Sequence, residues 1–141
     1  MSFFLRRGFA TSAVRRSLFT DHIARVRPTV PAISVNSLDT ILLDDYKAAH
    51  LFDVREPYEW NEERIPTAKY TGRGLLEKLV ESEVSGPSDE ILLYCSNGNR
   101  SLLAAEGLKA AGYQNVKYLE GGISAWKNAQ KSLKRNIQAA H

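Results

Sequence analysis

The feature that most constrains the fold is a short apolar run that ends at the chain's single cysteine. Residues 91–94 read Ile-Leu-Leu-Tyr, with no polar residue between the apolar ones. Such a run is typical of a central strand in a parallel sheet that is covered on both faces. A helical pattern follows over 101–111 and ends at Gly112, a residue type that favours helix C-termini. Cys95 is therefore expected just past the end of a buried strand.

Other apolar runs alternate with helical patterns along the chain. This alternation predicts right-handed crossovers and an α/β fold, a doubly wound domain whose central, mostly parallel sheet of five strands carries helices on both faces. Ligands of such folds bind beyond the carboxyl ends of the strands, so the site is expected directly after Tyr94. The predicted strands cover 33–35, 51–54, 68–70, 91–94 and 116–119.

The first thirty residues differ in charge from the rest of the chain. They hold six arginines and one acid, a net charge of +5; since the whole chain carries +3, residues 31–141 carry −2. With serines, threonines and apolar residues between the arginines, segment 1–30 is typical of a mitochondrial targeting sequence, and we predict a matrix protein. The alternative is a basic arm that contacts nucleic acid or stays solvated. The charged residues of segment 1–30 are Arg6, Arg7, Arg15, Arg16, Arg25, Arg27 and Asp21.

The remaining organisation is simple. Residues 31–128 are expected to form one domain, 20–32 a linker with two prolines, and 129–141 a basic, solvated C-terminal extension. A single cysteine excludes a disulfide within the chain and a cysteine-rich zinc site, and we expect no metal or organic cofactor. No apolar stretch has the length of a membrane span. We expect no nucleic-acid partner.

The loop after the buried strand reads Cys-Ser-Asn-Gly-Asn-Arg-Ser over residues 95–101. Its glycine and asparagines tolerate the left-handed conformations that let backbone N–H groups curl inward. Such N–H groups at a helix N-terminus bind anions and favour a thiolate, and Arg100 adds a positive charge. We predict Cys95 as the nucleophile. The predicted substrate-binding residues are Ser96, Asn97, Gly98, Asn99, Arg100 and Ser101.

This combination suits attack on an anionic sulfur donor such as thiosulfate, which leaves sulfite and a persulfide on Cys95. An acceptor thiol, such as glutathione or thioredoxin, or cyanide then removes the outer sulfur. Once the thiol is ionised no general base is needed, and the three histidines lie far from the loop in the sequence. Asp53 and Arg55, at the end of another predicted strand, either line the entrance to the loop or form a structural ion pair, the interpretation favoured for Asp53.

Over residues 33–127 the sequence resembles the rhodanese family. The resemblance is carried by the loop 95–101, by Phe-Asp-Val-Arg-Glu-Pro-Tyr-Glu over 52–59, and by the ending 112–126. It implies a doubly wound α/β fold, a persulfide on Cys95, and anion binding by the loop backbone and Arg100. Residues 63–68 read Glu-Arg-Ile-Pro-Thr-Ala where the family usually has Gly-His-Ile-Pro-Gly-Ala, which indicates a changed turn.

Two other functions fit parts of the sequence. Cysteine-dependent phosphatases of this fold place five residues between their cysteine and arginine, whereas four residues separate Cys95 from Arg100. The shorter loop suits a single sulfur atom better than a phosphate. A non-catalytic rhodanese module that binds protein partners often lacks the cysteine, which this chain retains.

Overall fold

The computed structural model describes residues 16–47 and 49–136. The first half of the predicted targeting segment and the last five residues of the predicted C-terminal extension lie outside the described residues. Among the described residues, none of the helices has both the length and the apolar character of a membrane span.

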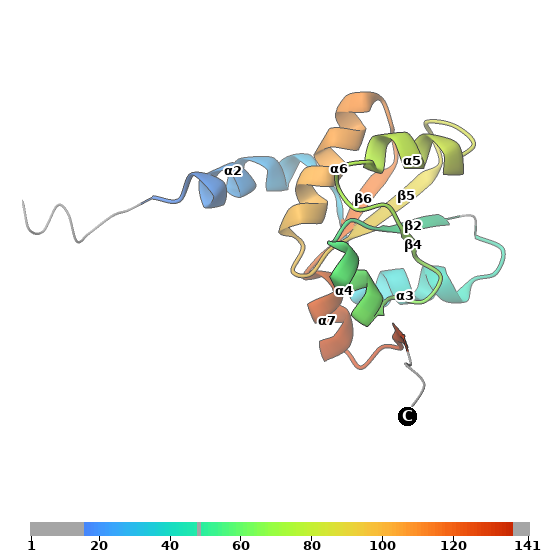
Figure 1. Cartoon of the computed structure of the whole chain (residues 1–141). Coiled ribbons are helices and arrows are strands. Elements are labelled where there is room, and N and C mark those ends of the chain that lie inside the picture. Colours follow the sequence, from blue (N-terminus) through green and yellow to red (C-terminus); the bar gives the residue numbers. More distant parts are fainter. Residues whose placement is uncertain (1–15, 48, 137–141) are drawn as a thin grey trace, which may run out of the picture.

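The central sheet has five strands, all parallel, in the order β1-β6-β5-β2-β4. Helices cover both faces of this sheet (Figure 1), which confirms the predicted α/β class. The strands are β1 (Ala32–Ile33), β2 (Ala49–Asp53), β3 (Glu63–Arg64), β4 (Lys69–Tyr70), β5 (Glu90–Tyr94), β6 (Val116–Leu119) and β7 (Lys134–Arg135). The helices are α2 (Leu18–Val26), the 3₁₀ helix η1 (Arg27–Thr29), α3 (Val35–Leu43), α4 (Pro57–Glu62), α5 (Leu76–Glu83), α6 (Asn99–Ala111) and α7 (Gly122–Asn128).

Strand β5 lies in the middle of the sheet and its side chains alternate between two cores. Ile91 and Leu93 pack in the core that contains residues of α2, α5 and α6, and Cys95 continues this side. Leu92 and Tyr94 pack in the other core, with residues of α3 and α7. All five are fully buried. Since successive side chains of a strand point to opposite faces, an uninterrupted apolar run requires helices on both, as predicted.

Residues 20–32, predicted to be a linker, contain most of α2, η1 and the start of β1. Ser17 caps α2, since its Oγ accepts a hydrogen bond from the N–H of Thr20 at 3.2 Å. Ile23 and Val26 are buried in the core that α6 also lines, and α2 lies beside α6 (Figure 1). Ile23 and Val26, three residues apart, form a helical face that is too short to be recognised from the sequence of a segment with two prolines.

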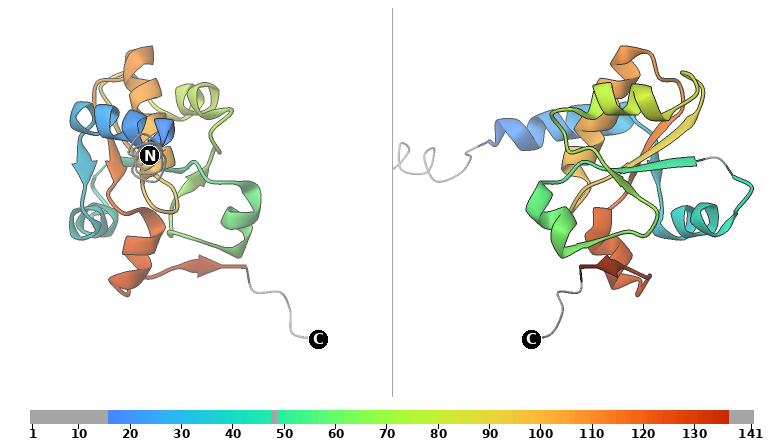
Figure 2. Two further views of the ribbon diagram at one scale, coloured as in Figure 1. Left: turned by 90° about the vertical axis from the view of Figure 1, so that its left-hand side faces the viewer. Right: turned by 45° about the vertical axis from the view of Figure 1, so that its right-hand side comes forward.

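The C-terminal extension, predicted to be solvated, is mostly exposed where the structure describes it, and it also contacts the domain. Strand β7 pairs antiparallel with β3, forming a separate two-stranded sheet. Figure 2 shows β7 near α7, apart from the central sheet. Arg135 Nε donates to a Glu63 carboxylate oxygen at 3.1 Å, and Trp126 Nε1 donates to the carbonyl of Ser132 at 2.7 Å. The positive charge of this segment therefore serves partly as a contact to the domain.

Candidate active site

The cysteine loop connects β5 to α6 at the carboxyl end of the sheet. Strand β5 ends at Tyr94, and α6 begins at Asn99 directly after Gly98. Gly98 has a φ of +104°, a left-handed conformation that glycine adopts without strain. A Cβ at this position would also lie 3.3 Å from the backbone nitrogen of Gly121. The chain thus turns sharply from strand to helix, and it does so at the glycine.

The sulfur of Cys95 lies inside this turn. The backbone N–H groups of Gly98 and Ser101 donate to Sγ, with N···S distances of 3.1 and 3.3 Å. Ser101 Oγ donates to the carbonyl of Gly98 at 3.2 Å, which closes the turn around the sulfur. Since the first N–H groups of a helix have no carbonyl partner within it, they are free to hold a sulfur that carries negative charge.

The other predicted loop residues lie on the outer side of the turn. Asn97 is exposed, and its side-chain oxygen accepts a hydrogen bond from the N–H of Asn99 at 3.1 Å. Ser96 is half-buried, and its carbonyl accepts from the N–H of Ser124 at 3.0 Å. The structure therefore brings all seven residues of the loop into one compact unit around Cys95, which is itself fully buried.

The start of α7 packs against the backbone of the cysteine loop. The N–H of Ile123 donates to the carbonyl of Cys95 at 2.9 Å. Gly122 lies against the same backbone, because a Cβ built on it would approach the carbonyl oxygen of Cys95 to 2.6 Å and that of Ser96 more closely still. Gly122 also has a φ of +61°. The glycine pair at 121–122 is thus needed for close contact with the loop, a role that the sequence analysis did not assign to it.

Asp53 and Arg55 form a buried ion pair next to the loop. Asp53 is paired in register with Tyr94, and Arg55 Nη2 donates to Asp53 Oδ2 at 2.7 Å and to the carbonyl of Glu63 at 2.7 Å. Their exposed fractions are 0% and 4%. Burial alone would lower the pKa of Arg55, but the hydrogen bonds and charge of Asp53 raise it above its ordinary value. The Arg55 guanidinium and the Asp53 carboxylate therefore bind each other at the end of β2.

Arg100 is bound to an acid that the sequence analysis did not single out. Its Nη1 and Nη2 each donate to one carboxylate oxygen of Glu59, both at 2.9 Å. Glu59 also accepts from the N–H of Glu56, which closes a capping box at the start of α4. The hydrogen bonds from Arg100 lower the pKa of Glu59, and those to Glu59 raise the pKa of Arg100. The positive charge of Arg100 is therefore largely balanced.

The segment 63–68, which departs from the family pattern, contains a residue in the left-handed region. Thr67 has a φ of +69°, a conformation that is strained for a β-branched residue. Arg64 donates to the carbonyl of Trp60 at 3.1 Å, and its guanidinium carbon lies 4.7 Å from the centre of the Trp60 ring.

Among the residues that the structure describes, neither a histidine nor a metal-binding group adds to this site. His50 contacts Asp89 at 3.2 Å near the amino end of β2, His22 is exposed on α2, and His141 lies outside the described residues. Within 16–47 and 49–136, no group of three or more His, Cys, Asp or Glu side chains is placed to hold a metal ion.

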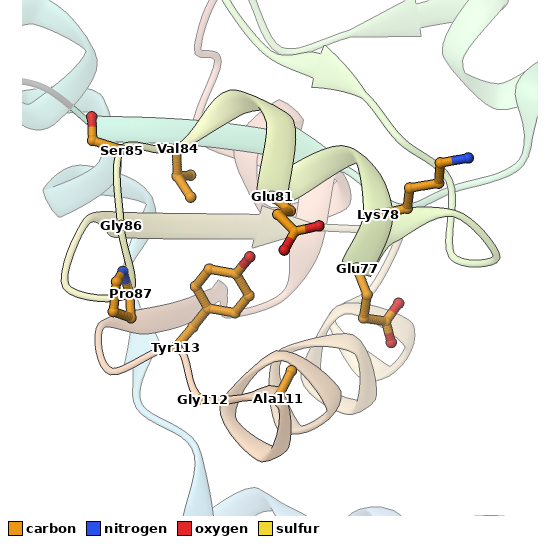
Figure 3. Close-up of a pocket in the computed structure, with 10 residues that line it drawn as sticks. All are labelled: Glu77, Lys78, Glu81, Val84, Ser85, Gly86, Pro87, Ala111, Gly112 and Tyr113. Carbon is orange, nitrogen blue, oxygen red and sulfur yellow. The ribbon is translucent and has the colours of Figure 1, made fainter.

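A cavity of about 730 Å³ lies at the opposite end of the central strand. Figure 3 shows it between α5, the loop that precedes β5, and the end of α6. Cys95, in contrast, follows β5, so the cavity and the thiol are separated by the length of that strand. The cavity is lined by Glu77, Lys78, Glu81, Val84, Ser85, Gly86, Pro87, Ala111, Gly112 and Tyr113.

Comparison with known proteins identifies the family. The rhodanese-like domain matches residues 34–129. Thiosulfate sulfurtransferase 18 of Arabidopsis thaliana is 35% identical over 92 residues, covering 63% of this chain and 64% of that protein. A crystal structure of thiosulfate sulfurtransferase from Pseudomonas aeruginosa has a TM-score of 0.70 and 26% identity, covering 77% of this chain and 20% of that one.

A third similarity concerns the fold alone. A protein of unknown function from Rhodopseudomonas palustris, described as a possible tyrosine phosphatase, has a TM-score of 0.73 at 22% identity, covering 86% of this chain and 97% of that one. The chain spans between 21% and 64% of the length of the first curated relatives that it matches. The family match covers residues 34–129, more than half of this chain, and includes the cysteine loop. The chain therefore belongs to the rhodanese-like domain family.

Proposed function

We propose that this protein moves a sulfane sulfur from thiosulfate or a related donor to a thiol or cyanide acceptor through a persulfide on Cys95. The observation that carries the proposal is the pair of N–H groups, from Gly98 and Ser101, that donate to Sγ at the carboxyl end of β5. Membership of a family with members named sulfurtransferases supports this chemistry. Since the chain has one cysteine, it offers one place for the intermediate.

The proposed reaction has two displacement steps. The Cys95 thiolate attacks the outer sulfur of thiosulfate, and a new S–S bond forms while the S–S bond of thiosulfate breaks and sulfite leaves with the electron pair. An acceptor thiolate, such as that of glutathione or thioredoxin, then attacks the outer sulfur of the persulfide and leaves as a new persulfide. The Cys95 thiolate is restored. Neither step needs an outside oxidant or reductant.

The burial of Cys95 adds a requirement for local movement. Because the exposed fraction of Cys95 is 0%, a donor contacts Sγ only after side chains around the loop move apart. Arg100, whose side chain is 38% exposed, and the exposed Asn97 are among the loop side chains that solvent reaches. In this proposal, residues 96–101 bind the donor chiefly through backbone N–H groups, with Arg100 contributing to the rim.

The geometry of the loop favours sulfur transfer over phosphate chemistry. Only four residues lie between Cys95 and Arg100, and both terminal nitrogens of Arg100 are bound to Glu59. A phosphatase needs a guanidinium that is available to the oxygens of its substrate. Here that guanidinium must first leave its carboxylate, whereas a persulfide needs only the N–H groups already directed at the sulfur.

Intact-mass analysis of the full chain after exposure to thiosulfate tests the proposal. We expect a gain of about 32 mass units, one sulfur atom, that a thiol reagent reverses. The matched control is Cys95→Ser, whose hydroxyl stays protonated at neutral pH and cannot hold a persulfide; it should show no gain and no transfer activity. Denaturant unfolding of both proteins verifies that the fold is intact.

The two possible failures of this test differ in meaning. Transfer activity that persists in Cys95→Ser would refute the mechanism. If the unmutated protein gains no sulfur from thiosulfate, a cysteine desulfurase loaded with sulfur serves as the second donor. A gain from that donor alone would replace thiosulfate by a protein persulfide, and no gain from either would indicate a non-catalytic binding module.

For the location of the protein, we propose the mitochondrial matrix. The proposal is supported by the six arginines and one acid of residues 1–30. Part of this segment, α2, also packs on the domain, so the import signal and the folded domain share residues. A reporter fused to residues 1–30 should enter mitochondria, and a reporter that stays in the cytosol would contradict the proposal.

A further inference from the structure

A second arginine contacts the cysteine loop from outside the region that matches the family. Arg27 belongs to η1, seven residues before the matched range 34–129 begins. Its Nη2 lies 3.5 Å from the side-chain oxygen of Asn99, and its Nη1 lies 3.5 Å from the hydroxyl of Tyr118. Asn99 stands between the two residues whose N–H groups bind the sulfur. The guanidinium of Arg27 therefore lies against the first turn of α6, beside the loop that holds the sulfur, an edge that we call the rim of the sulfur site.

The position of Arg27 is fixed by the elements on either side of it. Ile23 and Val26, directly before it, are buried in the core against α6. Thr29, directly after it, donates from its hydroxyl to the carbonyl of Val26 at 2.7 Å and accepts at its own carbonyl from Lys109 of α6 at 2.7 Å. These contacts hold the backbone of η1 against the helix that starts at the cysteine loop.

The charge of Arg27 is not balanced in the way that the charge of Arg100 is. Both partners of Arg27, an amide oxygen and a phenol, are neutral. Among the described residues, no carboxylate lies within ion-pair distance of Arg27, whereas Arg100 makes two hydrogen bonds to Glu59. Arg27 is also exposed, so that a solute approaching the rim meets its charge.

We propose that Arg27 is a specificity-determining residue of this site, which raises the reactivity of Cys95 toward small anionic sulfur compounds relative to neutral ones. The inference rests on the proposed function for the kind of substrate, though not for its test. An inorganic donor such as thiosulfate and a carboxylate-bearing thiol acceptor share the negative charge that Arg27 attracts. Because the residue lies outside the matched range, this selectivity is a property of this chain's N-terminal helices.

Two alkylating reagents test the inference without requiring sulfur transfer. Iodoacetate and iodoacetamide both alkylate Sγ with loss of iodide, and they differ in charge. Since the chain has one cysteine, intact mass follows each reaction at a single position. The measured quantity is the ratio of the two rate constants at low ionic strength. The burial of Cys95 slows both reagents and therefore affects the ratio little.

We expect Arg27→Gln to lower the iodoacetate-to-iodoacetamide ratio about threefold, the size expected of one charge acting at a solvated rim. The glutamine amide keeps a donor for Asn99, and the iodoacetamide rate should stay unchanged. High salt should remove the difference between Arg27→Gln and the unmutated protein. Arg25→Gln is the matched control, because it removes the same charge from an exposed position two residues away and should leave the ratio unchanged.

The outcomes separate this inference from the proposed function. An unchanged ratio in Arg27→Gln would overturn the inference, and an equal change in both rates behind that ratio would indicate a structural role for Arg27. An equal fall of the ratio in Arg25→Gln would reduce it to an effect of net charge. If thiosulfate forms no persulfide but the ratio falls only in Arg27→Gln, the inference about Arg27 stands and the proposed donor fails. If both hold, the KM for thiosulfate should rise in Arg27→Gln with little change in kcat.

Discussion

The two ends of the central sheet differ in how their polar groups are held. At the carboxyl end, Asp53 and Arg55 are 0% and 4% exposed. At the amino end, the corresponding pair of His50 and Asp89 has side chains 24% and 25% exposed, beside the loop that borders the open cavity. The Asp53–Arg55 ion pair is thus shielded from water, while the His50–Asp89 pair is open to it. Because the two pairs differ chiefly in burial, removing one charge from each tests how far burial determines the cost.

Removing one charge from each pair should give the largest contrast. Asp53→Asn leaves the positive charge of Arg55 buried without its partner, and we expect a loss of about 4 kcal/mol in the free energy of unfolding. Asp89→Asn leaves a histidine that water can reach, and we expect a much smaller loss. Denaturant unfolding of both variants measures the contrast. Equal losses would show that burial does not distinguish the two ends.

A double variant sharpens this first prediction. Asp53→Asn with Arg55→Met removes the uncompensated charge, so the double variant should be more stable than Asp53→Asn alone. If it is less stable, the hydrogen bond from Arg55 to the carbonyl of Glu63 and the packing of its side chain contribute more than the buried charge costs.

Two glycines give the second contrast. Gly122 lies against the carbonyls of the cysteine loop with a φ of +61°, whereas Gly112 ends α6 beside the cavity with a φ of +115° and no atom within 4 Å of a built Cβ. Gly112→Ala should cost about 1 kcal/mol, for backbone strain alone. Gly122→Ala adds a clash with backbone and should cost about 3 kcal/mol. It should also change the alkylation rate of Cys95, which Gly112→Ala should not.

The parts of this fold that could be predicted from the sequence depend on neighbouring residues. The run 91–94, the glycine in the loop and Gly112 at the end of a helix each carry a local signal, and the structure has them as expected. The position of Cys95 beside backbone N–H groups is predictable for the same reason, because strand, turn and helix follow one another within a few residues.

The parts that could not be predicted depend on distant residues that the fold brings together. Glu59 and Arg100 are 41 residues apart, and Arg27 and Asn99 are 72 apart. No periodicity or spacing links such pairs before the order of the strands is known. For Arg27, composition indicates a targeting segment rather than the rim of a site, because the residue is one of six arginines in segment 1–30.

The ion pair of Glu59 and Arg100 tests whether position in the sheet or burial determines the cost of removing a charge. It lies at the carboxyl end, like Asp53 and Arg55, but is partly exposed. The side chain of Arg100 is 38% exposed, so Glu59→Gln should cost less than about 1 kcal/mol at pH 7, far below Asp53→Asn. A loss as large as that of Asp53→Asn would mean that position at this end, rather than burial, determines the cost. Glu77→Gln, which removes the ion-pair partner of Arg73 at an exposed position of α5, is the control and should cost less still.

The acid dependence of the same variant gives the smallest effect. Hydrogen bonds from Arg100 lower the pKa of Glu59, so the folded state binds fewer protons there than the unfolded state does. The stabilisation is therefore complete above the unfolded pKa of about 4.3 and is lost as the pH falls through the lowered folded pKa. The difference in unfolding free energy between the unmutated protein and Glu59→Gln should shrink from pH 7 to pH 3. A constant difference would mean that packing of the side chain, rather than its charge, stabilises the rim.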